Sequence, residues 1–399
     1  MPPSKPLLII VTEAALEHPD AVPLSPKDKE RVNGVVRTYQ GLQEPLEKFY
    51  DVKYITPFDY PGTESKRRAA FHKNQPFSIP QQKSVRLVVP STKDLDKRIG
   101  QLKPAHVHIA TEGPLGLRAM NYCKKRGISV SSAFHTNWQQ YVKEDGFNVP
   151  GVPRKISATA TLAFLKRFHK KADAVMAATP ELKQGLVEWG LNGDKVHLVN
   201  RGIDTAVFHP YTAAESPSKE EYIVCIGRVA PGKGVDDFCE LDTKGIKKIV
   251  VGTGPSFDEL KAKYPDVEFA GYKQGQDLAK YYAGAKLFVL PSETETLGMT
   301  VMEALGCGTP VAALTRGGHQ PIINAAPGLG VMTDKLQDAV DSALSNPGQF
   351  KSRAEIAAFA HQTMSWSHEA ENFRDMAEAA KPAKKKHRLH LPKFGHGNG

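Results

Sequence analysis

The stretch PSETETLGMTVMEALGCGTPV, at residues 291–311, directly follows the apolar run Leu287–Leu290. The apolar run fits a buried strand of a parallel sheet, and Pro291 ends it. Residues 299–305 show helical periodicity, and Gly298 lies just before them, where a glycine lets the backbone turn. A strand, a glycine turn and a helix in this order indicate an α/β fold.

The turn in this stretch predicts a site for a phosphorylated ligand. It would expose the amides of Leu297, Gly298 and Met299 at a helix N-terminus, where free N–H groups and the helix dipole favour phosphate oxygens. Glu295 and Glu303 lie eight residues apart, one on the loop and one in the helix. Carboxylates do not bind phosphate but accept hydrogen bonds from hydroxyls. A nucleoside diphosphate sugar, with hydroxyls on both sides of its diphosphate, satisfies both requirements.

Strand-like runs alternate with helical segments along the chain, as is typical of parallel sheets with helices on both faces. The polar segment 209–221, which contains two prolines, separates two sets of predicted strands. The first set is Leu7–Val11, Val52–Thr56, Val85–Val89, Val107–Ala110, Ser129–Phe134, Ala174–Ala178 and Val196–Val199. The second set is Tyr222–Ile226, Lys248–Val251, Val267–Ala270, Leu287–Leu290 and Pro310–Ala313.

The stretch 291–311 resembles the Glu-x7-Glu signature of retaining glycosyltransferases of the family-four group. The surrounding Pro-Ser, Thr-Leu-Gly and Glu-Ala-Leu-x-Cys-Gly-x-Pro-Val make the match specific. Further matches follow in the family's order over about residues 5–375, namely NGVV at 33–36, EGPLGL at 112–117, HT at 135–136, NRGID at 200–204 and GR at 227–228. The sequence is most similar in look to bacterial sugar transferases and sulfoquinovosyl-diacylglycerol synthases.

This resemblance implies a GT-B fold, in which two Rossmann-like parallel-sheet domains face a central cleft. Residues 1–208 would form the acceptor-binding domain and residues 209–365 the nucleotide-sugar-binding domain. Residues 366–380 would form a helix crossing back to the first domain, and the basic segment 381–399 a disordered tail. The implied activity is the transfer of a hexose from a nucleoside diphosphate sugar, UDP-linked before GDP-linked, to an acceptor hydroxyl.

Two cations are expected to hold the diphosphate of the donor. Arg228 follows the predicted strand YIVCIG, and Lys233 comes five residues later on the same loop. Both can neutralise the charge that grows as the sugar departs, so no metal is expected. The resemblance assigns Glu295 to the hydroxyls of the transferred sugar and Glu303 to the ribose.

Glycines and one aromatic residue complete the expected nucleotide site. Gly252 and Gly254 follow another predicted strand, where the backbone could approach the nucleotide closely or simply turn. Tyr272 occupies the position at which the family's loop meets the nucleobase, and packing is an equal alternative. Gly34 opens a predicted helix and would approach the donor phosphate or the reacting sugar.

The first domain would supply contacts to the sugar and the acceptor. His135 ends the predicted strand SVSSAFH, and the resemblance assigns it to the donor sugar. Asn33, Thr136 and Tyr141 are assigned to the acceptor side. The family offers no secure carboxylate nucleophile, so we expect front-face substitution, in which the departing diphosphate takes the proton of the acceptor.

Charge is distributed unevenly along the chain. Residues 1–210 contain 31 Lys/Arg and 20 Asp/Glu, residues 211–380 contain 16 and 23, and residues 381–399 contain 6 and none. A basic first domain, with the patches 66–73 and 166–171 and the basic tail, favours a lipid or other anionic acceptor and an anionic membrane surface. A solvated charged face explains the same patches. The loop 14–30 is longer than usual and would border the acceptor cleft.

The four cysteines are widely spaced, which indicates buried thiols and a cytoplasmic protein. The basic patches and tail add the expectation of peripheral attachment to the inner face of the membrane. No stretch has the length of a signal peptide or a membrane span. A nucleic-acid-binding or nucleic-acid-glycosylating protein and a nucleotide-sugar epimerase remain alternatives, although no nucleic-acid recognition motif is present. A dinucleotide dehydrogenase is excluded because no Gly-x-Gly-x-x-Gly turn follows the first strand.

Overall fold

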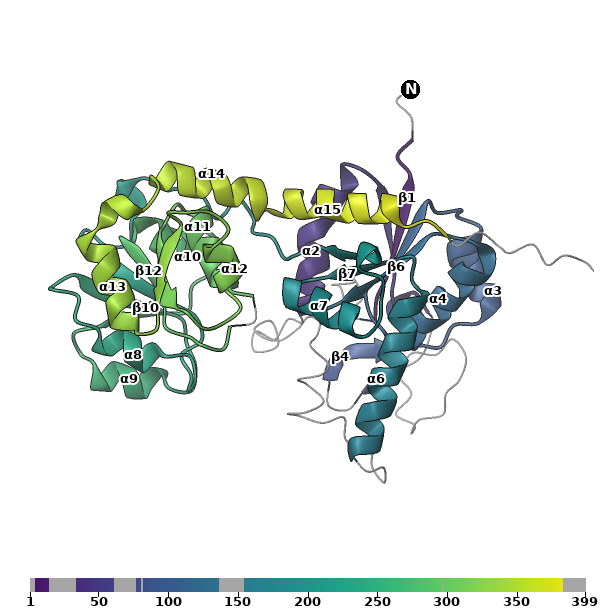
Figure 1. Ribbon diagram of the computed structural model, residues 1–399, viewed down its shortest axis with the longest axis horizontal. Coiled ribbons are helices and arrows are strands. Elements are labelled where there is room, and N and C mark those ends of the chain that lie inside the picture. Colours follow the sequence, from purple (N-terminus) through teal and green to yellow (C-terminus); the bar gives the residue numbers. More distant parts are fainter. Residues whose placement is uncertain are drawn as a thin grey trace, which may run out of the picture. The chain divides into compact units, whose positions relative to one another are not determined.

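The computed structural model describes residues 4–13, 34–60, 77–79, 82–135, 154–295 and 297–382 (Figure 1). The chain divides into two compact units, which are described separately below. Unit 1 contains residues up to Val199 together with those from Asn372 onward, and unit 2 contains Asn200–Glu371. The patch 66–73, the loop 14–30 and the tail beyond residue 382 lie outside the described residues.

Unit 1 is built around a parallel sheet of six strands in the order β2-β1-β5-β6-β7-β8. Its strands are β1 (Leu7–Val11), β2 (Asp51–Ile55), β5 (His106–Ile109), β6 (Val130–Phe134), β7 (Ala174–Ala177) and β8 (Val196–Leu198). Its helices are α2 (Gly34–Glu47), η1 (Pro57–Asp59), α3 (Thr92–Leu95), η2 (Asp96–Gly100), α4 (Pro114–Arg126), α6 (Arg154–Lys171), α7 (Pro180–Glu188) and η3 (Gly193–Lys195).

Unit 2 contains a second parallel sheet of six strands, in the order β11-β10-β9-β12-β13-β14. Its strands are β9 (Tyr222–Ile226), β10 (Lys247–Val251), β11 (Glu268–Gly271), β12 (Leu287–Leu290), β13 (Val311–Leu314) and β14 (Gly330–Thr333). Its helices are η4 (Ala213–Glu215), α8 (Val235–Glu240), α9 (Phe257–Lys263), α10 (Gly275–Gly284), α11 (Met299–Gly306), α12 (Gln320–Ile323), α13 (Leu336–Ser345), η5 (Pro347–Gln349) and α14 (Arg353–Thr363). The two sheets with their helices confirm the predicted α/β class.

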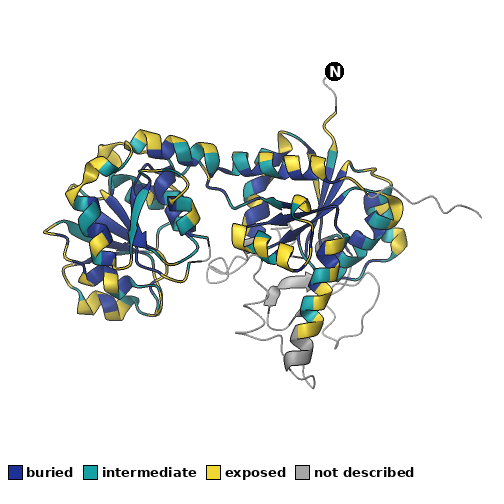
Figure 2. Cartoon of the chain, in the orientation of Figure 1, coloured by how far each residue is buried: buried dark blue, intermediate teal, exposed yellow. Residues whose placement is uncertain are grey.

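Burial on both faces explains the continuous apolar runs of these strands (Figure 2). All five residues of β9 are buried, and successive side chains enter different cores. Val224 packs into one hydrophobic cluster, whereas Ile223 and Cys225 pack into the cluster on the opposite face. The four cysteines are buried and unpaired, as predicted.

Two strand predictions need correction. The run 85–89, placed among the strands of the first domain, begins in β4 (Gln82–Leu87) and extends two residues beyond it; β4 pairs antiparallel with β3 (Phe77–Ile79) in a separate hairpin. Lysine, serine and arginine interrupt β4, and a central parallel strand would instead be uniformly apolar. Strand β14 was not predicted, because it is a short edge strand whose residues are only partly buried.

The sequence places the domain boundary at residues 208 and 209, but the structure places it nine residues earlier, after Val199. The intervening segment packs within unit 2: Ile203 forms a bridge with Ser365 and donates its amide to the carbonyl of Met364 at 2.8 Å. The side chain of Glu369 accepts from the amide of Asn200 at 2.7 Å. Helix α15 (Trp366–Ala379) begins in unit 2 and ends in unit 1.

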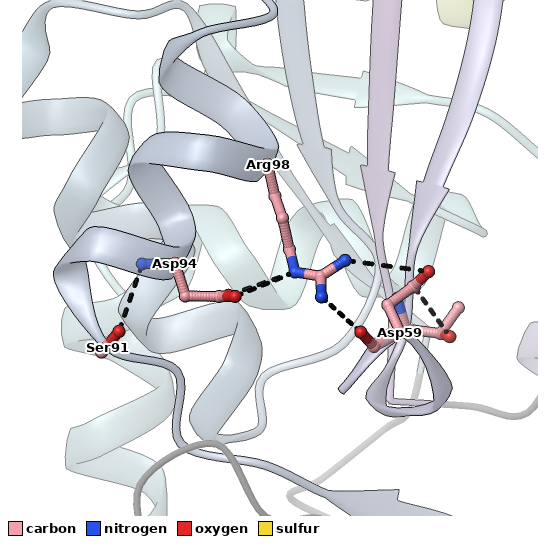
Figure 3. A network of polar contacts seen from close by, with 5 residues as sticks. Asp59, Ser91, Asp94 and Arg98 are labelled. Atoms are coloured by element: carbon pink, nitrogen blue, oxygen red, sulfur yellow. Dashed lines mark hydrogen bonds and ion pairs between the residues drawn. The ribbon is translucent and has the colours of Figure 1, made fainter. Parts of the chain in front are cut away.

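A polar network connects the loop after β2 with the helical segment α3–η2 (Figure 3). Arg98 donates to the Asp94 carboxylate at 3.2 Å and to the carbonyl of Asp59, while the Asp59 carboxylate accepts from the Thr56 amide at 2.7 Å. Asp94 and Asp96 have the Asp-x-Asp spacing found at some metal sites, but both are paired. The Asp96 carboxylate accepts from Arg126 at 2.7 Å. These contacts fix the loop after β2 against α3 and η2.

Among the described residues, no helix combines the length and the apolar character needed to cross a bilayer.

Candidate active site

The strand order of unit 2 places a topological switch point between β9 and β12. From β9 the chain proceeds through β10 to β11 on one side, and then crosses to β12 on the other side. In open parallel sheets, ligands bind at this point, at the carboxyl ends of the strands. The loop after β9 carries Lys233, and the loop after β12 carries Glu295.

An ion pair joins these two loops. The Lys233 ammonium lies 2.8 Å from Oε1 of Glu295, and the side chains are 34% and 22% exposed, respectively. The Thr294 hydroxyl adds a weaker bond to the carbonyl of Gly232 at 3.4 Å. The structure thus brings together two residues that lie 62 positions apart and that the sequence assigned to neighbouring parts of one donor.

Glycines allow the loops at this edge to pack backbone against backbone. A Cβ on Gly252 would lie 1.9 Å from the carbonyl oxygen of Gly227, and one on Gly254 would lie 2.2 Å from that of Val229. Gly234, at a φ of 67°, packs against the carbonyl of Pro291 in the same way. Close approach therefore explains Gly252 and Gly254, which the sequence assigned to the nucleotide.

Gly298 forms the turn before α11. Its φ of 74° and ψ of 47° are left-handed, a conformation that glycine adopts without strain. A Cβ at this position would meet Cβ of His319 at 2.8 Å. The turn leaves Leu297 and Met299 partly exposed beside the helix N-terminus, where their amides were expected.

His319 supports this turn and was not predicted from the sequence. The imidazole is fully buried, and its Nε2 bonds the carbonyl of Leu314 at 2.9 Å. The amide of Gly318, the residue before it, donates to the carbonyl of Glu295 at 2.7 Å. The glycine pair at 317–318, just before His319, is a sequence feature that could have indicated a turn here.

Glu303 has a partner of its own in the structure. The buried Tyr282 on α10 donates its hydroxyl to Oε2 of Glu303 at 2.9 Å. Burial, followed by the Glu303 charge, raises the pKa of Tyr282 well above its ordinary value, so this hydroxyl keeps its proton. The two glutamates of the signature are therefore each held by a residue from another element.

Two further residues at this edge are accessible to a ligand. Arg228 is exposed, and no carboxylate among the described residues pairs with it. Tyr272 is 55% exposed and donates its hydroxyl to Gln274 at 3.3 Å. It follows Gly271, whose carbonyl accepts from the amide of Gly252 at 2.8 Å. Tyr272 is thus not a core residue.

In unit 1 the switch point lies between β1 and β5, and a buried carboxylate occupies it. Glu13, 2% exposed, follows β1; it accepts from the Thr111 hydroxyl and from the amide of Gly116 at 3.0 Å. Burial raises the pKa of Glu13 to about 7. Apart from its place just after the first predicted strand, no feature of the sequence pointed to Glu13.

His135 ends the same edge of the first sheet, after β6, and is half-buried. Its Nε2 lies 3.3 Å from the hydroxyl of Tyr39 on α2, the helix that Gly34 begins. Asn33, Thr136 and Tyr141 lie outside the described residues.

Comparisons with known proteins agree with this geometry. The family model described as Glycosyltransferase Family 4 matches residues 32–207, and the model described as Glycosyl transferases group 1 matches residues 220–346. The chain belongs to the family-four glycosyltransferases. The glycosyltransferase also has the fold of sucrose-phosphate synthase from Thermosynechococcus elongatus, with a TM-score of 0.61, 17% identity, and coverage of 94% of this chain and 98% of that chain.

Two relatives of this glycosyltransferase illustrate the range of activities named within the family. A GDP-mannose-dependent alpha-mannosyltransferase of Mycobacterium tuberculosis is 27% identical over 305 residues, covering 73% of this chain and 78% of the relative. A sulfoquinovosyl transferase of Arabidopsis thaliana is 24% identical over 306 residues, covering 72% of this chain and 54% of that protein. The comparisons establish a glycosyltransferase with a sugar-nucleotide donor and favour neither the epimerase nor the nucleic-acid alternative.

Proposed function

We propose that this glycosyltransferase moves a hexose from a GDP- or UDP-linked donor to a lipid hydroxyl, with retention of configuration at the anomeric carbon. One observation carries the proposal: the 2.8 Å pair of Lys233 and Glu295 spans the switch point beside the turn at Gly298. A cation, a carboxylate and helix N-terminal amides match a diphosphate and its sugar hydroxyls.

Each residue of the site has a defined task in this proposal. Arg228 and Lys233 bind the diphosphate and stabilise the charge that develops as it leaves, which makes a metal ion unnecessary. Glu295 accepts hydrogen bonds from the transferred sugar, and Glu303 accepts them from the ribose. His135 contacts a hydroxyl of the transferred sugar.

The reaction we propose is a front-face substitution. The bond between the sugar and the diphosphate breaks, and the acceptor oxygen forms its bond to the same face of the anomeric carbon. The departing diphosphate takes the proton of the acceptor. The protein contributes position and charge stabilisation and forms no covalent intermediate.

The names of relatives guide the choice of donor and acceptor. The mycobacterial relative is named as GDP-mannose-dependent. An alpha-monoglucosyldiacylglycerol synthase of Streptococcus pneumoniae, 25% identical over 231 residues that cover 52% of this chain and 51% of that protein, is named for a diacylglycerol product. We therefore place GDP-mannose and UDP-glucose first among donors, and diacylglycerol lipids first among acceptors.

Helix α6 supports a lipid acceptor. Its exposed residues include Phe164, 38% exposed, together with Arg167 and Lys170. An apolar ring beside cations suits the headgroup region of an anionic membrane, where each cation contributes about 1 kcal/mol. We propose that this side of α6 lies against the cytoplasmic face of the membrane.

The donor test offers the purified protein GDP-mannose, UDP-glucose or ADP-glucose as the donor. The acceptor is supplied as diacylglycerol vesicles, and each reaction is run with and without EDTA. We expect one donor to give a glycolipid whose anomeric proton shows retained configuration by NMR. Inverted configuration would refute the front-face reaction. Loss of activity in EDTA would refute the role given to the two cations.

The membrane test measures sedimentation with phosphatidylglycerol vesicles. We expect the triple variant Phe164→Ser, Arg167→Gln, Lys170→Gln to bind at least about 10-fold more weakly, because it loses two surface cations and an apolar contact. The matched control is Lys125→Gln with Lys195→Gln, two exposed lysines of the same unit. Equal weakening in both variants would contradict a specific role for α6.

A further inference from the structure

A continuous series of hydrogen bonds crosses the interior of unit 1, from His135 to the end of α15. It uses alternate residues of neighbouring strands, because His108 lies opposite Ser131 in the register of β5 and β6 and both point to one face. We call it the His–Ser chain, and its members in order are Tyr39, His108, Ser131, His106 and Ser129.

The contacts in this chain are short. Oη of Tyr39 lies 2.6 Å from Nε2 of His108, whose Nδ1 lies 2.7 Å from the Ser131 hydroxyl. Nε2 of His106 lies 2.7 Å from the same Ser131 hydroxyl, and Nδ1 of His106 lies 2.8 Å from that of Ser129. All but Ser129 are at most 2% exposed.

The end at α15 sets the direction of every bond. The carbonyl of Ala380 can only accept, so the Ser129 hydroxyl donates to it, at 2.6 Å. Because the single hydroxyl proton of Ser129 is engaged with this carbonyl, the Ser129 oxygen can only accept from His106, which must donate from Nδ1. Burial lowers the pKa of His106 to about 3, so its imidazole is neutral and Nε2 carries a lone pair. Ser131 therefore donates to His106.

The same reasoning continues to His135. Since the Ser131 proton is used, His108 donates from Nδ1, and burial lowers the pKa of His108 well below its ordinary value, so Nε2 accepts. Tyr39, whose pKa burial raises, donates its proton to His108. The oxygen of Tyr39 is then left to accept from Nε2 of His135 at 3.3 Å.

We propose that the His–Ser chain selects the ring tautomer of His135, with its proton on Nε2 and its lone pair on Nδ1, so that Tyr39, His108 and Ser131 are positioning residues for the glycosyl transfer. Any group that bonds Nδ1 must then be a donor, and a sugar hydroxyl is one. The effect on catalysis rests on the proposed contact of His135 with the transferred sugar, whereas the tautomer does not.

Helix α15 contributes directly to this arrangement. Phe373 packs edge-on against the His108 ring with centroids 4.8 Å apart, and Ala380 supplies the terminal acceptor. Ser129 and Ala380 are 251 positions apart in the sequence. The proton position on His135 therefore depends on the docking of the last helix.

The first test breaks the chain in its middle with Ser131→Ala. His108 then loses its acceptor at Nδ1 and should move its proton to Nε2. Tyr39 would then accept from His108 and donate its own proton to Nε2 of His135, so the His135 proton would shift to Nδ1. Long-range 1H–15N spectra of 15N-histidine protein report the tautomer, and His135→Gln identifies the His135 signals among the 14 histidines. The matched control is Ser132→Ala, which also loses a buried hydroxyl, 2.9 Å from Nδ1 of His169, outside the chain.

We expect the His135 signals to show an Nε2 proton in the native protein and in Ser132→Ala, and an Nδ1 proton in Ser131→Ala. Turnover should fall about 5- to 10-fold in Ser131→Ala, the value of one hydrogen bond, and less than about 2-fold in the control. An unchanged tautomer in Ser131→Ala, or an Nδ1 proton in the native protein, would overturn the proposal.

A second variant covers failure of Ser131→Ala to fold. Tyr39→Phe keeps the ring contacts with His108 and His135, whose centroids lie 5.6 and 5.8 Å away, but removes the linking hydroxyl. We expect a mixture of His135 tautomers, and a single Nε2 tautomer would overturn the proposal. Full activity in His135→Gln would refute the proposed sugar contact while leaving the tautomer result unaffected, so the two failures are distinguishable.

Discussion

Each sheet has a carboxylate at its switch point, but the two carboxylates have opposite surroundings. Glu13 in unit 1 is almost fully buried and bonds a hydroxyl and a backbone amide, both neutral donors. Glu295 in unit 2 is partly exposed and pairs with the Lys233 ammonium. Burial without a counter-charge raises the pKa of Glu13, whereas a partly exposed ion pair can exchange its partner for a ligand.

The same position in two similar sheets therefore serves two purposes. At the first switch point, the carboxylate connects β1 with the start of α4 through its bonds to Thr111 and Gly116. At the second, the glycine-packed loops leave their polar side chains toward solvent, where a donor can reach them. The difference is testable, because a structural carboxylate should affect unfolding and a binding carboxylate should affect turnover.

The largest effect is expected at the exposed pair. Glu295→Gln and Lys233→Ala should each lower kcat/KM about 10²- to 10³-fold, as preorganised charged groups typically do. The free energy of unfolding should change by less than about 1 kcal/mol, because the pair is partly exposed. Steady-state kinetics and urea unfolding measure the two quantities.

The matched control for this pair is Glu268→Gln. Glu268 pairs with Lys247 at 2.9 Å in the same unit, with side chains 41% and 31% exposed, but it lies at the start of β11, away from the carboxyl ends of the strands. It should retain full activity. Retention of full activity by folded Glu295→Gln would remove the distinction between the two carboxylates.

The buried carboxylate should produce a pH-dependent stability. The folded pKa of Glu13, about 7, exceeds its ordinary value of 4.5, so the folded protein binds more protons between these values. The contribution of Glu13 to the free energy of unfolding is fully present below about pH 4.5. It is lost as pH rises through 7, which lowers the free energy of unfolding by at most about 3 kcal/mol. Glu13→Gln should lose this dependence when unfolding is followed between pH 5 and 8. If the free energy of unfolding changed equally with pH in wild type and variant, Glu13 would not be the source of the pH dependence.

The turn at Gly298 should be moderately sensitive. Gly298→Ala is expected to cost about 2 kcal/mol, from the left-handed backbone and from contact with His319. Gly245→Ala is the control, because Gly245 has a φ of 88° with no atom near the added Cβ. Thermal unfolding should show a larger loss for Gly298→Ala. Equal losses would mean that His319 does not support the turn.

The smallest effect is expected at Tyr282→Phe, which removes one hydrogen bond to Glu303. The KM for the donor should rise about 5-fold, corresponding to about 1 kcal/mol, with little change in kcat. Tyr222→Phe loses an equivalent buried bond, to the carbonyl of Tyr281 at 3.0 Å, and should leave KM unchanged. A similar rise in both variants would assign the effect to general loosening of unit 2.

Much of the fold could be predicted because buried parallel strands leave a strong local signal. The runs Leu7–Val11, Tyr222–Ile226 and Leu287–Leu290 coincide with β1, β9 and β12. The hairpin strand β4 was misplaced because an isolated apolar run does not reveal its partner. The first nine residues of unit 2 were placed in the first domain because their partners, Met364 and Glu369, lie about 160 residues later.

The sequence by itself determined the α/β class, the two sheets and the turn between Glu295 and Glu303, because strand burial and a left-handed glycine depend on neighbouring residues. Only the tertiary structure decided which side chains meet. It paired Lys233 with Glu295, placed Tyr282 on Glu303, buried Glu13 beside Thr111, and joined His135 through the His–Ser chain to Ala380. These partners lie on different strands and helices, and their distances follow from sheet order and register, which no local pattern specifies.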